Sequence, residues 1–168
     1  SGQVTFHAIS QSGITQTPAI FTGSGTASPV KVVARGDAGP AGSIVNVIPL
    51  NFQMNNAGQV VYVAGLVGGS SPEGIFLGTA GGAQASVALA GAGAPGTGGG
   101  VFSDFRNFDI ELNNSGAVAF RADITGGTAS SGVYLGSASA PPAPRLIEGK
   151  PLPGGGTAGF LTPALNFI

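Results

Sequence analysis

The stretch NNSGAVAF, at residues 113–120, occurs nearly three times in this chain. Residues 55–62 read NNAGQVVY, and residues 1–6 read SGQVTF. The turn glycine and the final aromatic residue of the three copies are Gly2 and Phe6, Gly58 and Tyr62, and Gly116 and Phe120. Asparagine and glycine favour tight turns, and alternating side chains are typical of a half-buried strand. Each copy therefore predicts a polar turn that leads into a β-strand.

Three further patterns recur at the same interval as the turn glycine. They are an aliphatic residue followed by an aromatic one, a glycine four residues before a proline, and the pair Asn-Phe. Their positions are Ile20-Phe21, Ile75-Phe76 and Val133-Tyr134; Gly36, Gly91 and Gly149; and Asn51-Phe52, Asn107-Phe108 and Asn166-Phe167. All spacings lie between 55 and 59 residues. A fixed period of this length indicates a repeat protein. We predict one repeat domain over residues 1–168, with repeats at 1–54, 55–112 and 113–168.

Each period has room for four short strands. In the second repeat we expect them at about residues 58–66, 74–78, 85–90 and 106–112. The 31 glycines interrupt every apolar pattern of helical period, so the predicted class is all-β. Four strands in a unit of about 40–60 residues are typical of a β-propeller blade, here of four antiparallel strands. An open array of the same units is the alternative.

The composition argues against several classes of partner. Only 8% of the 168 residues are charged, the net charge is -1, and the six Lys and Arg form no basic stripe. We therefore expect neither nucleic-acid binding nor an electrostatic membrane anchor. No apolar run is long enough to span a bilayer, so we expect no membrane insertion. The chain has no cysteine, which excludes disulfides and thiolate metal sites.

The ends of the chain fall inside the predicted repeats. Residue 1 already lies in the first copy of the phrase and no signal peptide is visible, so we expect further residues before it. Residues 165–168 would begin the innermost strand of another blade. Two interpretations remain open: a window on a longer array, or a chain that associates with itself by strand addition. In the second, two copies would form a ring of six blades, and a contact that fails to close would give a fibre.

The predicted innermost strand carries the main candidates for chemistry. Asn107, Asp109 and Glu111 alternate with apolar residues and share one face of the strand. Two carboxylates about 7 Å apart could bind Ca²⁺ through oxygen ligands or resemble a glycosidase acid pair. The alternative is a hydrated channel wall, because Gln53 and Asn55 occupy the corresponding positions of the preceding repeat. A hydrolase or lyase would use Asp104, Asp109 or Glu111.

The other polar and aromatic positions have structural interpretations. Asn55 and Asn113 precede the turn glycines, where asparagine accepts left-handed or Asx-turn geometry. The phenylalanines that follow the recurring asparagines are expected in the core between blades; they are Phe52, Phe108 and Phe167. His7 is the only histidine, and valine and arginine occupy its corresponding positions, so we expect no zinc site or catalytic triad there. We predict no catalytic residue and no cofactor.

Asn113, Gly116, Ala119 and Phe120 match the motif N-x-x-G-x-x-A-F in full. The chain thus resembles the bacterial tandem-repeat family named for that motif, whose members carry varied C-terminal surface anchors. The phrase is also similar to the TolB-type and WD40-like propeller repeat. That similarity implies a strand order, from innermost to outermost, of residues 106–112, 116–123, 132–136 and 145–148. The resemblance implies a secreted or bacterial cell-surface location and no reaction.

The sequence is compatible with three functions. The first is a non-enzymatic extracellular scaffold for adhesion, matrix or fibre, whose partner is itself or further repeats of a longer chain. The second is a propeller that binds a glycan or peptide on the face carrying the loops at about 36–49, 91–105 and 149–164. The third is the hydrolase or lyase mentioned above. We favour the scaffold.

Overall fold

The chain is built from β-strands. A computed structural model describes residues 2–105 and 110–159. The strands are β1 (Gln3–Ser12), β2 (Thr15–Ser24), β3 (Val30–Ala34), β4 (Ala38–Gly39), β5 (Gly42–Met54), β6 (Gln59–Val67), β7 (Glu73–Thr79), β8 (Gln84–Leu89), β9 (Val101–Asp104), β10 (Ile110–Leu112), β11 (Val118–Thr125), β12 (Ser131–Gly136) and β13 (Ala143–Ile147). The all-β prediction is confirmed, and within the described residues there is no helix that could cross a membrane.

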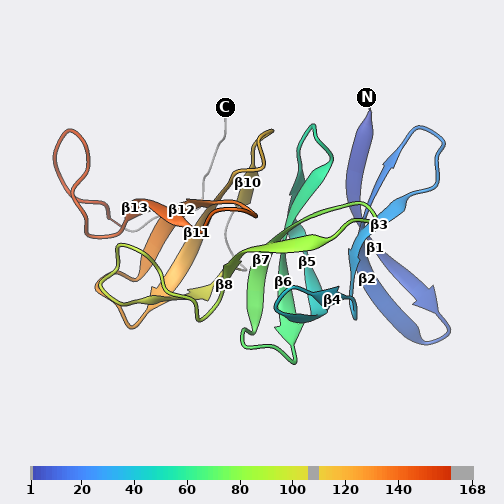
Figure 1. Ribbon diagram of the computed structural model, residues 1–168, viewed down its shortest axis with the longest axis horizontal. Coiled ribbons are helices and arrows are strands. Elements are labelled where there is room, and N and C mark those ends of the chain that lie inside the picture. Colours follow the sequence, from blue (N-terminus) through green and yellow to red (C-terminus); the bar gives the residue numbers. More distant parts are fainter. Residues whose placement is uncertain (1, 106–109, 160–168) are drawn as a thin grey trace.

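The strands form three antiparallel sheets that lie side by side along the long axis of the molecule (Figure 1). The first sheet has the order β1-β2-β3, and the second has the order β4-β5-β6-β7-β8. The third has the order β10-β11-β12-β13, with β9 pairing to the far end of β11. Each sheet follows the chain from one strand to its neighbour, which is the simplest connection for short strands joined by glycine-rich turns.

The strand order of the third sheet agrees with the order that the propeller resemblance implies. Of the strand predicted at residues 106–112, the structure describes the part Ile110–Leu112 as β10, and a further strand, β9, precedes it at Val101–Asp104. Residues 106–109 lie outside the described part. In the second sheet a single strand, β5, occupies the corresponding place, with irregular register between Val47 and Phe52. The loop expected at about residues 91–105 therefore ends earlier, where β9 begins at Val101.

Two apolar layers hold the three sheets together. Between the first and second sheets, Ile20 and Val33 pack with Tyr62 and Phe76. Between the second and third, residues from the opposite face of the second sheet, such as Val61, pack with the aromatic face of the third. The aromatic face of the third sheet is formed by Phe102, Phe105, Phe120 and Tyr134, whose ring centroids lie 4.9–5.9 Å apart in the contacting pairs. The second sheet, which lies between the other two, is thus buried on both faces.

The same backbone hydrogen bond follows the last strand of each of the three sheets. The amides of Gly36, Gly91 and Gly149 donate to the carbonyl oxygens of Ile44, Phe102 and Ala158, at 2.6, 2.8 and 2.7 Å. All three glycines have positive φ angles, between 78° and 90°, which side chains other than glycine rarely tolerate. The glycine pattern in the sequence therefore corresponds to a recurring chain reversal, which at Gly36 and Gly91 leads the chain into the next sheet.

Replacing Phe120 by alanine tests the packing between the second and third sheets. Phe120 is fully buried and its ring contacts three other aromatic rings. We expect Phe120→Ala to lower the free energy of unfolding by about 3–5 kcal/mol, because it removes a large buried ring and leaves a cavity. Urea unfolding followed by circular dichroism measures the change. Ile14→Ala is the matched control: Ile14 is 101% exposed, and its replacement should change stability by about 0.5 kcal/mol or less. Equal effects would contradict this assignment of the core.

Candidate functional site

The asparagine turns are held by bonds within each turn. The side-chain oxygen of Asn55 accepts hydrogen bonds from the amides of Ala57 and Gln59, both at 3.0 Å. Asn113 Oδ1 accepts from the amides of Ser115 and Ala117, at 3.0 and 2.9 Å. The glycines of these turns, Gly58 and Gly116, have φ angles of 75° and 82°. This is the geometry expected of asparagine before a turn glycine. Gly2 lies just before β1 and is exposed.

The same asparagine turns also connect the second sheet to the third. Asn55 Nδ2 donates to the carbonyl oxygen of Asn113 at 2.9 Å, and the amide of Asn56 donates to Asn114 Oδ1 at 3.0 Å. Each bond joins residues 58 positions apart. Gly116 lies against Gln59, so a Cβ at this glycine would come within 3.1 Å of the Gln59 side chain. The turns therefore form one polar seam along the ends of the sheets.

Gln53 and Glu111 extend this seam into the strands. Gln53 Nε2 donates to Glu111 Oε2 at 2.9 Å, and Gln53 Oε1 accepts from the amide of Leu112 at 2.5 Å. One amide side chain thus bridges β5 and β10. Glu111, a candidate calcium ligand, has a structural partner, whereas Asn107 and Asp109 lie outside the described residues, as do Phe108 and Phe167. Among the described residues no group of three or more His, Cys, Asp or Glu could hold a metal ion.

The aromatic positions of the repeated phrase differ in burial between the sheets. Tyr62 and Phe120 are fully buried, whereas Phe6 is only half-buried. Phe52 is partly buried and packs on the core between the first two sheets. The hydroxyl of Tyr62 donates to Gln84 Oε1 at 2.7 Å, and burial, assisted by Asp37, raises its pKa. Burial also raises the pKa of Tyr134 to about 12, so both tyrosines remain neutral donors at physiological pH.

His7 lies opposite Ile20 in the β1–β2 pair, on the side of the first sheet that packs against the second. Its Nε2 is buried and has no hydrogen-bond partner among the described residues. Among the described residues it belongs to no group of three or more His, Cys, Asp or Glu that could hold a metal ion. This environment suits a packed imidazole at an apolar interface.

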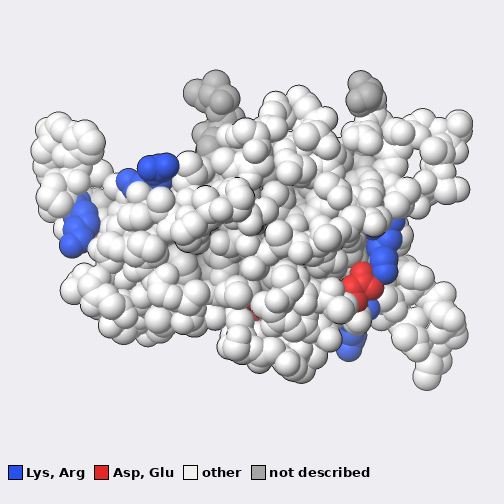
Figure 2. Space-filling model, in the orientation of Figure 1, with Lys and Arg blue, Asp and Glu red and all other residues white. Residues whose placement is uncertain are grey.

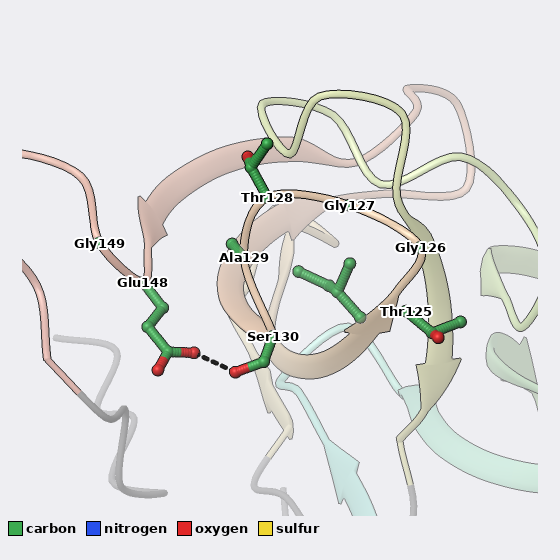
Figure 3. A pocket seen from close by; sticks show the side chains of 9 residues that line it. Thr125, Gly126, Gly127, Thr128, Ala129, Ser130, Glu148 and Gly149 are labelled. Atoms are coloured by element: carbon green, nitrogen blue, oxygen red, sulfur yellow. Dashed lines mark hydrogen bonds between the residues drawn. The ribbon is translucent and has the colours of Figure 1, made fainter.

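A polar groove lies at one end of the third sheet. The loop from Thr125 to Ser130, together with Glu148, lines a hollow of about 560 Å³ (Figure 3). An adjoining hollow of about 550 Å³ shares Ile124, Thr125 and Ser130 with it. The adjoining hollow adds polar residues from β9, β11 and β12, namely Ser103, Arg121, Asp123 and Ser131. Hydroxyls, carboxylates and one guanidinium therefore line these two adjoining hollows, which together we call the polar groove.

Glu148 is held at the edge of this polar groove by two serines. Its Oε2 accepts a hydrogen bond from Ser130 Oγ (Figure 3). It also accepts one from Ser131 Oγ, at 3.0 Å. The bond from Ser130 and then that from Ser131 stabilise the carboxylate and lower its pKa. Asp123 is different: burial is the main cause of its raised pKa, while Arg121, whose Nη2 lies 3.3 Å away, opposes the shift. The groove therefore keeps one carboxylate firmly ionised beside one that protonates more readily.

Sequence reasoning missed Glu148 and Glu73. The serines and threonines of residues 125–131 look like an ordinary polar turn in the sequence, with nothing that links them to Glu148. The pairing of β12 with β13 is what brings Glu148 to these residues, because it places the backbone of Glu148 against Ser131. Glu73 is 1% exposed, and its Oε1 accepts from the amide of Phe105 at 2.9 Å. No sequence pattern marked Glu73, since serine takes its place at the start of β12.

Comparison with known proteins gives one match. Residues 1–167 match the model of a family described as "Family of unknown function (DUF7453)". The chain belongs to this family. No curated protein and no solved structure matches the chain. Nearly the whole length is covered by the family match, so the three sheets, the seam and the polar groove all lie within the region that DUF7453 describes.

Removing the side chain of Asn55 tests the seam. Asn55→Ala leaves the amides of Ala57 and Gln59 and the carbonyl of Asn113 without this partner. We expect the free energy of unfolding to fall by about 1–3 kcal/mol. Asn56→Ala is the matched control, because Asn56 contributes its backbone amide, which alanine retains. Urea unfolding compares the two variants, and a loss for Asn56→Ala as large as for Asn55→Ala would contradict the role of the side chain.

Removing the hydroxyl of Ser130 tests the electrostatics of the polar groove. Because hydrogen bonds hold the pKa of Glu148 below its usual 4.5, Ser130→Ala should raise that pKa toward 4.5. The bonds stabilise the fold above the pKa of the unfolded chain, and this contribution disappears as pH falls through the lower folded pKa. NMR titration of the Glu148 side-chain carboxyl measures the shift. Ser139→Ala, in the exposed β12–β13 connection, should leave the pKa unchanged. An unchanged pKa in Ser130→Ala would refute the assignment.

Proposed function

We propose that the chain is a non-enzymatic scaffold of β-propeller-type repeats, exposed on a bacterial surface or secreted. The observation that carries the proposal is the recurrence of one sheet-to-sheet interface. Corresponding positions, Val60 and Val118, Tyr62 and Phe120, and Phe76 and Tyr134, are all fully buried between neighbouring sheets. Stability then comes from packing each unit on the next, as in other repeat architectures. The full match to N-x-x-G-x-x-A-F at residues 113–120 supports an extracellular location.

The low charge supports a scaffold as well. Figure 2 shows mostly uncharged surface on the face drawn, with Lys and Arg in separate spots. Side chains that are polar but neutral, such as Gln53 and Asn55, make the bonds between the second and third sheets. The carboxylate of Glu111 accepts a hydrogen bond from Gln53, so it has a structural role. In an enzyme such a carboxylate would instead contact the substrate. A scaffold needs these contacts and no reactive group.

Labelling of intact cells tests the surface location. Lys31 has a side chain that is 50% exposed, and Lys150 is exposed, so both can react with an amine-specific biotin reagent that does not cross membranes. In the bacterium that makes this protein, or in its medium, we expect biotin on the protein without cell lysis. A cytosolic protein of the same cells is the control and should remain unlabelled. Labelling that appears only after lysis would overturn the proposed location.

The polar groove of the third sheet favours glycan binding as a second candidate function. Its hydroxyls and carboxylates can donate and accept hydrogen bonds with sugar hydroxyls. The groove lies mainly on residues 124–131 and 148–149, so only its edge belongs to the long loops that the sequence indicated. We expect a glycan array to yield binders that the double variant Ser130→Ala, Glu148→Gln loses by about tenfold or more. Ser139→Ala should retain them. An array without any binder would remove this candidate.

A further inference from the structure

A second, apolar hollow lies between β8 of the second sheet and the β12–β13 connection of the third. Its volume is about 290 Å³. Among its lining residues Val87 and Phe102 are buried, whereas Pro95 and Pro141 are exposed, so the hollow extends from the core to the surface. No lining residue is charged, and Ser86 is the only one with a polar side chain. We call this space the proline hollow.

The first interface between sheets shows how the same place can be filled. Lys31 of β3 and Ser86 of β8 occupy corresponding positions, because they pair with Phe21 and Phe76 directly after the same register shift. Lys31 Nζ lies 2.8 Å from Asp37 Oδ1. At the first interface a long side chain therefore reaches from the last strand of the sheet to the turn that follows it. Serine is too short to do the same at the second interface.

The acidic partner of that ion pair is also missing at the second interface. The amides of Asp37 and Ala92 donate to the carbonyl oxygens of Ala34 and Leu89, each at 3.1 Å, so the two turns have the same backbone geometry. Ala92 thus stands where a carboxylate would hold a lysine. Both replacements, serine and alanine, line the proline hollow. The hollow is therefore the space that an ion pair bridges one period earlier in the chain.

The sheet on the other side of the hollow has lost a polar group as well. In the second sheet the hydroxyl of Tyr62 donates to Gln84 Oε1 at 2.7 Å. Pro142 takes the place of Gln84 in the third sheet, since each directly precedes the residue that pairs with a leucine, Leu77 or Leu135. Proline has no side-chain donor or acceptor. A charged or strongly polar guest would therefore find almost no side chain in the hollow to replace its bonds to water.

The walls of the proline hollow are already held in place. The amide of Phe102 donates to the carbonyl oxygen of Ala92 at 3.0 Å, and the amide of Gly91 donates to that of Phe102 at 2.8 Å. The hydroxyl of Tyr134 donates to the carbonyl oxygen of Pro95 at 3.3 Å. The proline rings themselves are rigid. A flat and rigid guest suits such walls, because it loses little conformational entropy when it binds.

The volume limits the size of the guest. Ligand pockets in proteins begin at about 300 Å³, and a dry apolar cavity of about 150 Å³ can hold benzene. The proline hollow, at about 290 Å³, has room for one ring or two fused rings. Apolar lining, absence of charge and small size together describe a neutral aromatic molecule.

We propose that the proline hollow binds a small neutral aromatic compound of one or two fused rings. The guest packs against Phe102 and the prolines and fills the space that the Lys31–Asp37 pair bridges at the first interface. This binding goes beyond the scaffold function and does not involve the polar groove, which lies on other residues of the third sheet. Its failure would therefore leave both earlier proposals standing.

Titration with indole, followed by NMR of the Val87 methyl groups, tests the site. We expect these signals to shift and saturate in the wild-type chain. The double variant Ser86→Lys, Ala92→Asp rebuilds the ion pair inside the hollow and should weaken binding by about tenfold or more. The matched control is Gln11→Lys, Gln16→Asp, which places the same charges on two exposed residues that face each other in the β1–β2 pair. Circular dichroism checks that both variants are folded.

A wild-type chain whose Val87 signals do not respond to indole overturns the proposal, as do equal affinities of the two double variants. A second measurement needs no variant. Tryptamine and indole-3-acetate carry a charge on the same ring system, and each should bind the wild-type chain at least about tenfold more weakly than indole. Charged compounds that bind as tightly as indole would contradict the neutral guest. Tighter binding of n-hexanol, which is neutral but flexible, would contradict the aromatic one.

Discussion

The burial of one sheet face against the next is the interaction on which this structure depends. Each sheet has only three to five strands, and a single small sheet cannot remove enough apolar surface from water to be stable alone. The second sheet solves this by burying both faces, with Tyr62 and Phe76 on one side and Val61 and Ile75 on the other. The polar seam then fixes how the sheets are placed, because Gln53 and Asn55 bond to residues one period away.

Much of the local structure could be predicted because it is encoded locally. Asparagine before Gly58 and Gly116 specifies the turns, and the alternation after each glycine specifies β6 and β11. The strand β9 could not be predicted, because it is defined by an irregular pairing with Asp123–Thr125 of β11, about 20 residues further along the chain. Propeller closure remains a prediction, since the described sheets lie side by side and none closes into a barrel.

The polar groove shows the limit of sequence reasoning more clearly. Ser130 and Glu148 are 18 residues apart and share no motif. They meet because β12 and β13 pair with Gly132 opposite Ile147, a register that composition does not reveal. Glu73 is a similar case, since its bond to Phe105 spans 32 residues and crosses from the second sheet to the third. Contacts that depend on the register of strand pairing, or that join residues far apart in the sequence, are found only from the structure.

The recurring reversal at Gly36, Gly91 and Gly149 has a consequence for how such a chain can change in length. At Gly36 and Gly91 the reversal delivers the chain to the next sheet with the same backbone bond, and Gly149 repeats that bond after the third sheet. A gene duplication of one period would therefore add a sheet whose entry, exit and two faces already match those of its neighbours. Arrays of different length can then arise by recombination without a new interface having to evolve, and natural selection is left free to alter the loops between them.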